Sequence, residues 1–388
     1  MNDLLEIVAR SSGSTLPSLG NILFVSETGS TTQNRADGLG RIDKPFKLQR
    51  AFDVAQPNDI IIIYEAIPFT NYSVNISKLH IFIYTDHPII FNFNNTSSHE
   101  IYCYVRGITT FSFMNITNIQ NSRINIYTAN LLFNLSNCIN SVIYCQQYCD
   151  ITISSSLNNC TFKSNVRSIF RLNSNYNFSG LNIDNFVITS GAYHVKPTFT
   201  NCTFNKCIFN ILFSNLIVGV SNITNCFFYD SRLSMRYSGP STAQINISNN
   251  KFVRNLIDFT NLNINCTIIG NSTTNKFIDC VLFRSNVRSV RIENTTWILK
   301  DCIIHNPNSS ISSSGFFNVT GTCNLYLIDC KYELPPSSPY AISNDYTGEL
   351  QLINCQLPTN ITGGKTPTIT SNVFIGDLPN INDVLDNI

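Results

Sequence analysis

The chain alternates hydrophobic and polar residues in short runs, not along helical faces. Runs of four to six residues rich in Ile, Phe, Tyr and Val are separated by turns of Asn, Ser and Gly. Examples are LHIFIY (79–84), TTFSFM (109–114), SRINIY (122–127), FNILF (209–213) and LYLID (325–329). Because an apolar residue at every second position places one face of a strand in a core, the pattern predicts many short β-strands.

A tetrapeptide recurs along the chain: Asn or Asp, then Cys, any residue, and an apolar or aromatic residue. Four steps between consecutive cysteines of this motif are 24, 22, 28 and 25 residues, and Asn250 stands in the Cys position 24 residues after Cys226. Self-similarity at such a period indicates a solenoid, in which each unit buries its apolar face on its neighbours. The motif begins at Asn159, Asn201, Asn225, Asp279, Asp301, Asp329 and Asn354.

Two or three short strands in each repeat are typical of a parallel β-helix. We therefore expect an all-β, right-handed parallel β-helix of roughly twelve coils between Ile60 and Cys355, a rod of about 60 Å at about 4.8 Å per coil. Equivalent residues of successive coils stack. The repeated Cys should therefore fill a narrow core slot, and turn asparagines should bond to the asparagines above and below them.

One helical pattern precedes the first strand, at residues 46–56. Pro45 suits a helix start, Pro57 forbids continuation, and Pro-Asn-Asp then turns the chain into IIIIY (60–64). An open β-helix ends in unpaired backbone groups, so a cap must cover that edge. We expect this helix to be the cap, with one apolar face formed by Phe46, Leu48, Ala51, Phe52 and Ala55.

The cap resembles the N-terminal cap of the pectate-lyase-like superfamily, right-handed parallel β-helices in which Lys-Pro-Phe, Leu-Gln and a Pro-Gly-Asp turn precede the first strand. The resemblance extends through NILFVSETGSTTQNRADGLGRIDKPF (21–46) and the repeated coils. Two departures are Asn58 where Gly is usual and one residue fewer between Phe46 and Leu48. The superfamily includes polysaccharide lyases, glycosidases, esterases and non-catalytic phage and virus particle proteins. We divide the chain into 1–22 (anchor and linker), 23–59 (cap), 60–362 (β-helix) and 363–388 (C-terminal tail, a docking helix).

Composition narrows the classes of partner. Charged residues make up 13% of the chain and the formal net charge is +1, so neither nucleic acid nor an anionic membrane is expected as a partner. The first residues carry Asp3 and Glu6 where a secretion signal needs positive charge. We therefore expect the fourteen cysteines to be reduced and buried as small hydrophobic residues.

Candidate catalytic groups are few. The acids expected to stack in successive coils are Asp279, Asp301 and Asp329. They could bind a cation or include an acid with a raised pKa. The preferred interpretation is that they are turn residues equivalent to Asn. The paired-carboxylate signatures of polygalacturonase-like enzymes are absent from the sequence. GGKT (363–366) lacks the first Gly of a phosphate loop and is followed by Pro367. We expect no catalytic activity, no cofactor and no metal ion.

Two other features suggest contacts with partners. The insert 332–346 breaks the coil pattern and offers Tyr340 and Tyr346 as platforms for sugar stacking; the alternative is a plain surface loop. The two ends of the chain carry apolar stripes at helical spacing that cannot be buried on themselves. These assembly residues are Leu4, Ile7, Val8, Ile381, Val384, Leu385 and Ile388.

Together these patterns favour a structural protein of a virus particle, most simply a tailed bacteriophage. It would be a β-helical spike, head fibre or decoration subunit, assembled in the host cytoplasm into a homotrimer, attached by its tails to capsid or tail proteins and able to bind a host surface glycan. The first alternative is a tailspike depolymerase with carboxylates at a subunit interface. The second is a cellular adhesin.

Overall fold

A computed structural model gives the fold of the chain. It describes residues 21–371 apart from 66, 68–69, 85–88, 95–96, 105–112, 128–130, 191–194, 215–220, 239–242, 261–265, 285–289, 306–315, 334–341, 347–349, 354, 356–361 and 364–368.

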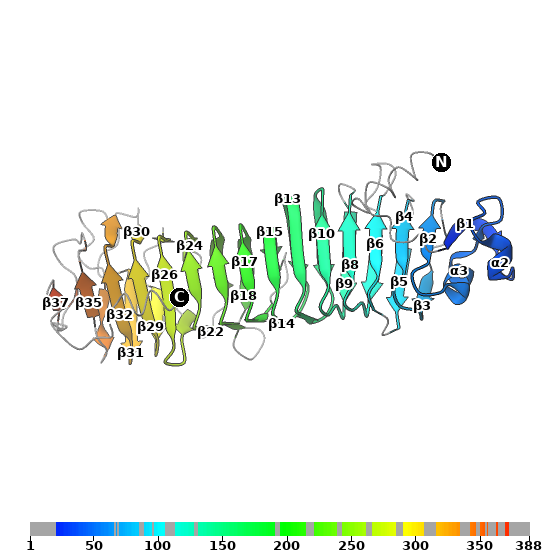
Figure 1. The fold of residues 1–388 in the computed structure, drawn as a ribbon. Helices are drawn as coiled ribbons and strands as arrows, with labels where there is room; N and C mark the ends of the chain where they lie inside the picture. The colour runs from blue at the N-terminus through cyan, green and yellow to red at the C-terminus, as the bar shows by residue number, and fades with distance from the viewer. Residues whose placement is uncertain are drawn as a thin grey trace.

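The described residues form a parallel β-helix, drawn as a rod in Figure 1. Two columns of parallel strands join into a 27-stranded sheet, and a third column forms a separate 10-stranded sheet. The expected all-β solenoid is confirmed. The first column runs the whole length of the rod: β1 (Ile22–Ser30), β2 (Ile60–Ile63), β4 (His80–Ile83), β6 (Glu100–Cys103), β8 (Arg123–Ile126), β10 (Val142–Cys145), β13 (Thr161–Leu172), β15 (Asn182–Thr189), β17 (Thr203–Asn205), β20 (Phe227–Tyr229), β23 (Lys251–Val253), β26 (Thr274–Ile278), β29 (Thr296–Lys300), β32 (Asn324–Ile328), β35 (Leu350–Ile353) and β37 (Ile369–Ser371).

The second column shares the long strands β13 and β15 with the first. Its other strands are β3 (Asn71–Val74), β5 (Ile89–Phe93), β7 (Phe113–Thr117), β9 (Leu131–Ser136), β11 (Cys149–Ile153), β18 (Ile208–Ser214), β21 (Arg232–Ser238), β24 (Leu256–Asp258), β27 (Val281–Phe283), β30 (Ile303–His305) and β33 (Lys331–Glu333). The third column contains β12 (Leu157–Asn158), β14 (Asn177–Ser179), β16 (Thr198–Thr200), β19 (Ser221–Thr224), β22 (Ala243–Ser248), β25 (Cys266–Ile269), β28 (Val290–Glu293), β31 (Phe317–Gly321), β34 (Ile342–Tyr346) and β36 (Thr362–Gly363).

Coil length varies along the rod. Ile60 pairs with His80, 20 residues later, and Val142 pairs with Thr161, 19 residues later. These coils are shorter than the period of the Cys motif because the third column is reduced there to single bridges, such as the one between Gln120 and Ile139. The coil count therefore differs slightly from the roughly twelve that a uniform repeat predicts.

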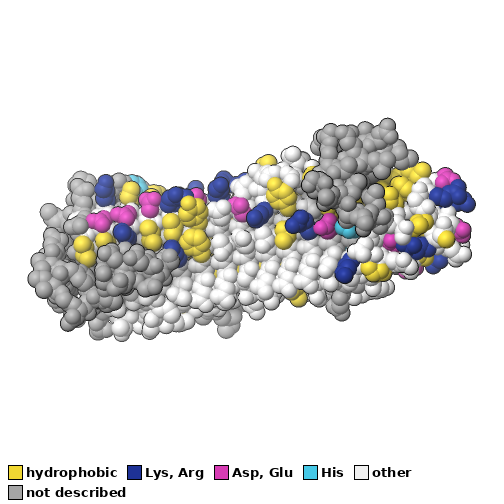
Figure 2. Space-filling view, in the orientation of Figure 1, with side chains coloured by type: hydrophobic (Ala, Val, Ile, Leu, Met, Phe, Trp, Pro, Cys, Tyr) yellow, Lys and Arg dark blue, Asp and Glu magenta, His cyan; other side chains and the backbone are white. Residues whose placement is uncertain are grey.

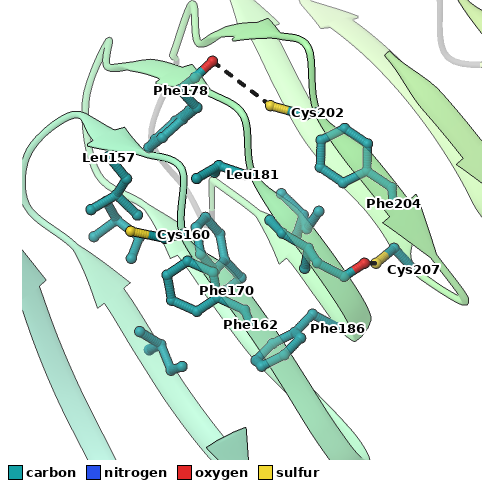
Figure 3. Packing of buried hydrophobic residues seen from close by; sticks show 14 of the residues in the cluster. Leu157, Cys160, Phe162, Phe170, Phe178, Leu181, Phe186, Cys202, Phe204 and Cys207 are labelled. Atoms are coloured by element: carbon teal, nitrogen blue, oxygen red, sulfur yellow. Dashed lines mark hydrogen bonds between the residues drawn. The ribbon is translucent and has the colours of Figure 1, made fainter. Parts of the chain in front are cut away.

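One apolar core extends along the axis of the rod. Inward positions alternate with outward ones, and aromatic rings repeat at the coil spacing: the centroids of Phe204, Phe228, Phe252 and Phe277 lie 4.8 Å apart at each step. Such regular stacking buries a large apolar area for each coil added. Elsewhere the rings meet edge to face, as with Phe162 and Phe170 in Figure 3, whose centroids are 5.0 Å apart.

The N-terminal cap has the expected helix, in a shorter form. The helix α3 spans Leu48–Val54 within the predicted 46–56, and a short helix α2 (Arg35–Gly38) precedes it. The five apolar cap residues predicted from the sequence are all buried. Asn58 has φ 72°, so it adopts the left-handed conformation expected of Gly at this turn. The same region also supplies β1, which pairs with β2 and thus extends the sheet.

None of the helices in the described part of the chain has the length and hydrophobicity needed to cross a membrane.

Candidate functional site

The repeated cysteines lie in the core, at inward positions that follow the turns. All fourteen are free; thirteen are buried and Cys355 is half-buried, which confirms the predicted burial. The thiols donate weak hydrogen bonds to carbonyls of the neighbouring coil, for example from Cys202 Sγ to Phe178 O at 3.8 Å (Figure 3). Burial raises the pKa of Cys207 and of Cys266 to about 12. Thiols of this kind are poor nucleophiles.

Asparagines take the cysteine position in several coils. Asn250 Oδ1 accepts a hydrogen bond from Cys226 N at 2.8 Å, and Asn250 Nδ2 donates to Ile223 O at 2.7 Å. Asn255 makes equivalent bonds with Ser231 N and Phe228 O. These buried amides satisfy backbone groups of two coils at once, so their role is structural.

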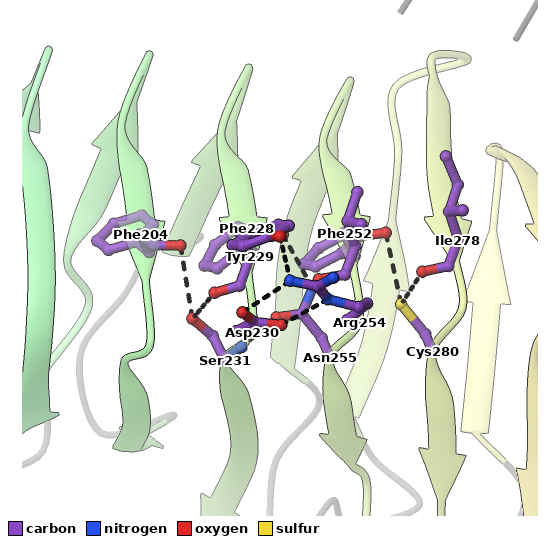
Figure 4. Close-up of polar contacts among 11 residues, drawn as sticks. Phe204, Phe228, Tyr229, Asp230, Ser231, Phe252, Arg254, Asn255, Ile278 and Cys280 are labelled. Carbon is purple, nitrogen blue, oxygen red and sulfur yellow. Dashed lines mark hydrogen bonds and ion pairs between the residues drawn. The ribbon is translucent and has the colours of Figure 1, made fainter.

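The aspartates of the repeat lie on exposed turns. Asp279, Asp301 and Asp329 have φ between 52° and 54° and occupy equivalent places in successive coils. The preferred interpretation, that they are turn residues equivalent to Asn, agrees with this left-handed conformation. The same row begins two coils before Asp279 with Asp230, which pairs with Arg254 of the next coil at 2.7 Å (Figure 4). In the described part of the chain, no three His, Cys, Asp or Glu side chains gather closely enough to hold a metal ion.

The other residues singled out by the sequence are not placed. Tyr340 and the assembly residues of both tails lie outside the described residues. Tyr346 is the last residue of β34, and only its backbone is described. The predicted sugar platform and the predicted anchors therefore stay predictions.

A shallow groove of ≈ 490 Å³ lies where the third column begins. Successive coils contribute two rows of outward side chains to it. We call this surface the amide groove; it is lined by Asn118, Gln120, Asn137, Ile139, Ser156, Leu157, Asn158, Asn177 and Ser179.

Backbone register aligns the first row of the amide groove. Gln120, Ile139, Asn158 and Ser179 pair in turn across four coils. Each is followed by a residue in the left-handed conformation, at positions 121, 140, 159 and 180. Since the left-handed residue ends the strand at the same place in every coil, the preceding side chains are held in one line along the rod.

The second row of the amide groove lies two residues earlier in each coil. Asn118 and Asn137 are themselves left-handed, and Asn137 Nδ2 donates to Asn118 Oδ1 at 2.8 Å. Ser156 Oγ accepts a hydrogen bond from Asn177 N at 3.0 Å. The expected asparagine ladder is thus present here, and it also joins Asn249 to Asn225 at 2.9 Å.

The amide groove was missed by our sequence analysis, although a signal exists. The tetrapeptides NIQN (118–121), NCIN (137–140), SLNN (156–159) and NFSG (177–180) share a polar, apolar, variable, Asn-or-Gly pattern. The repeat was defined by its inward Cys position, so the outward residues of these tetrapeptides were not compared between coils.

A second apolar cluster lies outside the core, on β2, β4 and β6. It contains Ile60, Ile62, Phe82 and Tyr102, whose exposed fractions are 2–5%. The rings of Phe82 and Tyr102 stack at 4.5 Å. Hydrogen bonds from His80 and then from Tyr102 lower the pKa of Glu100 to about 2, so this carboxylate remains charged across the physiological range.

Comparison with known proteins finds matches among solved structures alone. No family model matches the chain, and no curated protein matches its sequence. A mutant tailspike protein of E. coli bacteriophage HK620, in complex with pentasaccharide, matches with a TM-score of 0.31 and 10% identity over 93% of this chain and 73% of that chain. PfbA, a surface adhesin of Streptococcus pneumoniae, matches with a TM-score of 0.31 and 9% identity over 90% and 96% of the two chains. A rhamnogalacturonan lyase matches with a TM-score of 0.22 and 12% identity over 82% and 87%. At such scores these likenesses carry no argument about activity or ligand.

Proposed function

We propose that the chain is a non-catalytic, adhesive structural protein of a virus particle: a β-helical spike, head fibre or decoration subunit that binds a host surface glycan. The observation that carries the adhesive role is the amide groove. It presents amides, hydroxyls and an exposed isoleucine in aligned rows, and none of its lining residues is an acid or a base. Such a surface can hold a sugar polymer through hydrogen bonds, but it offers no group for general acid–base chemistry.

The free thiols support assembly in a reducing compartment. Cys138 and Cys160 lie in adjacent coils with their Sγ atoms 3.5 Å apart, and both are buried. Thiols so close together would be exposed to oxidation during folding in an oxidising compartment. Folding in a host cytoplasm, as for a viral protein made before release, avoids this hazard.

The alternative of a depolymerase depends on the row of Asp279, Asp301 and Asp329. Acids one coil apart meet the separation required of a carboxylate pair, about 5 to 10 Å. They lie on exposed turns, and none of them lines the amide groove. We therefore assign them to turn formation and keep glycan cleavage as the outcome that would replace our proposal.

The particle assignment is tested by fractionation. Antibodies against the full chain should detect it in virus particles purified on a density gradient, at a constant ratio to the capsid protein. Detection in the envelope of uninfected cells instead would replace the viral proposal with a cellular adhesin.

A further inference from the structure

We propose that the amide groove binds a neutral polysaccharide whose chain runs parallel to the axis of the rod. The inference rests on the proposed adhesive function and adds to it the place of binding, the charge class of the ligand and its direction.

The charge class follows from the lining of the amide groove. All nine residues that line it are uncharged. An anionic sugar placed there would lose hydration without gaining a basic partner, which disfavours its binding. A carboxamide both donates and accepts hydrogen bonds, as does a sugar hydroxyl. The groove can therefore donate hydrogen bonds to the hydroxyls of a neutral sugar or accept hydrogen bonds from them. Figure 2 shows a similar uncharged surface over much of the lower middle of the rod, with charged side chains mostly nearer the upper edge.

Three of the five amides of the groove are available to a ligand. The side chains of Gln120, Asn158 and Asn177 make no hydrogen bond within the described part of the chain. The other two amides, Asn118 and Asn137, bond each other, as Asn246 Nδ2 bonds Asn222 Oδ1 at 2.9 Å in coils further along the rod. A ligand that bound to the bonded pairs would compete with protein hydrogen bonds, whereas at Gln120, Asn158 and Asn177 it would replace water.

Ile139 provides an apolar contact within the first row. It is 37% exposed and is flanked along the row by Gln120 and Asn158. The CH face of a sugar ring can pack on such a side chain while the ring hydroxyls reach the neighbouring amides. Val166, 46% exposed, is the other large apolar side chain that stands exposed in the described structure, and it does not line the groove.

The direction follows from the repeat of the coils. Each row continues through four coils, at about 4.8 Å per coil. A polymer parallel to the axis therefore meets a similar pair of polar positions in every coil. A polymer lying across the rows would contact the pair of polar positions of one coil and then leave the groove. Lengthening such a polymer would therefore add few contacts.

The test uses the full chain, with dextran and galactomannan as neutral probes and polygalacturonate and alginate as acidic probes. Affinity is measured by biolayer interferometry for oligosaccharides of increasing length at low and high salt. The groove variants are Ile139→Ala and Asn158→Ala, and the matched control is Val166→Ala. All three positions are exposed, so the variants should fold as the parent does.

We expect a neutral probe to bind with little dependence on salt. Affinity should rise with oligosaccharide length until the groove is filled. Each groove variant should lose about tenfold in affinity, an effect of about 1.4 kcal/mol, while Val166→Ala should bind as the parent does. Glycan binding that the groove variants leave unchanged, or binding of the acidic probes alone, would overturn this inference and leave the adhesive function standing. Failure to bind any probe would contradict both.

Discussion

Arg35 and Asp59 join the segment before the cap helix to the first coil: Arg35 Nη2 lies 2.6 Å from Asp59 Oδ1 and 2.7 Å from Oδ2. Asp59 is 2% exposed, and it also accepts a hydrogen bond from Gln56 N at 2.7 Å. The carboxylate therefore ties together the cap, its turn and the beginning of β2. The Asp59 side chain is 3% exposed and that of Arg35 is 21% exposed, so removing one partner leaves the other partly buried without its opposite charge.

We predict that Asp59→Ala lowers the free energy of unfolding by about 2 to 3 kcal/mol, because Arg35 and the Gln56 N–H lose their acceptor. The measurement is urea denaturation, with aggregation followed by light scattering, since a loosened cap exposes the edge of the first coil. Asp43→Ala is the control: its pair with Arg41 is exposed, so no measurable change is expected. Equal losses in the two variants would contradict the role assigned to the cap.

The second prediction concerns the buried amide of Asn250. Replacement by Ala removes the acceptor of Cys226 N and the donor to Ile223 O, and should cost about 2 to 4 kcal/mol. Asn250→Cys should lose less than half as much, because Cys226 and Cys202 show that a thiol fits this position. The comparison is made from denaturation midpoints. A larger loss for Cys than for Ala would show that the slot does not accept both residue types.

The third prediction is that native protein reacts slowly with iodoacetamide. Intact-mass spectrometry should show at most one or two labelled thiols, with Cys355 modified first because it is the one half-buried cysteine. Unfolding in guanidinium should expose all fourteen thiols. Recovery of the purified protein with most cysteines in disulfides would refute both the free-thiol core and the proposed folding in a reducing compartment.

The fourth prediction is a loss of stability in acid that depends on His99. Burial lowers the pKa of His99 to about 4, below its ordinary value of 6.5, and its Nδ1 accepts a hydrogen bond from Leu79 N at 3.4 Å. Between these two pH values the unfolded chain binds a proton that the folded chain excludes. Stability should therefore fall as pH is lowered from 6.5 to 4, by up to roughly 3 kcal/mol.

The pH effect is measured as the slope of unfolding free energy against pH in the parent and in His99→Gln. The variant should be less stable at pH 7 but should show a flatter slope between pH 6.5 and 4. An unchanged slope would show that His99 is not the group responsible.

Much of the fold could be predicted from the sequence because the repeat leaves local signals. Cys and Asn recur at one place in the coil, Asn58 marks a left-handed turn, and the apolar face of 46–56 indicates a cap. Coil length could not be read in the same way, since the short coils before Asn159 have Ser122 and Ser141 at the position of the repeated Cys. The amide groove depends on which outward residues come into register, and that is decided by strand pairing between coils, not by local pattern.

The measurement that tests our central claim most directly is a search for cleavage products. The full-length protein is incubated with a host surface polysaccharide that it binds, and new reducing ends and unsaturated uronates are assayed over time. Our account predicts binding without any product, in the parent and in Asp301→Asn alike. Product formation by the parent that Asp301→Asn abolishes would contradict it, because the row of turn aspartates would then be catalytic.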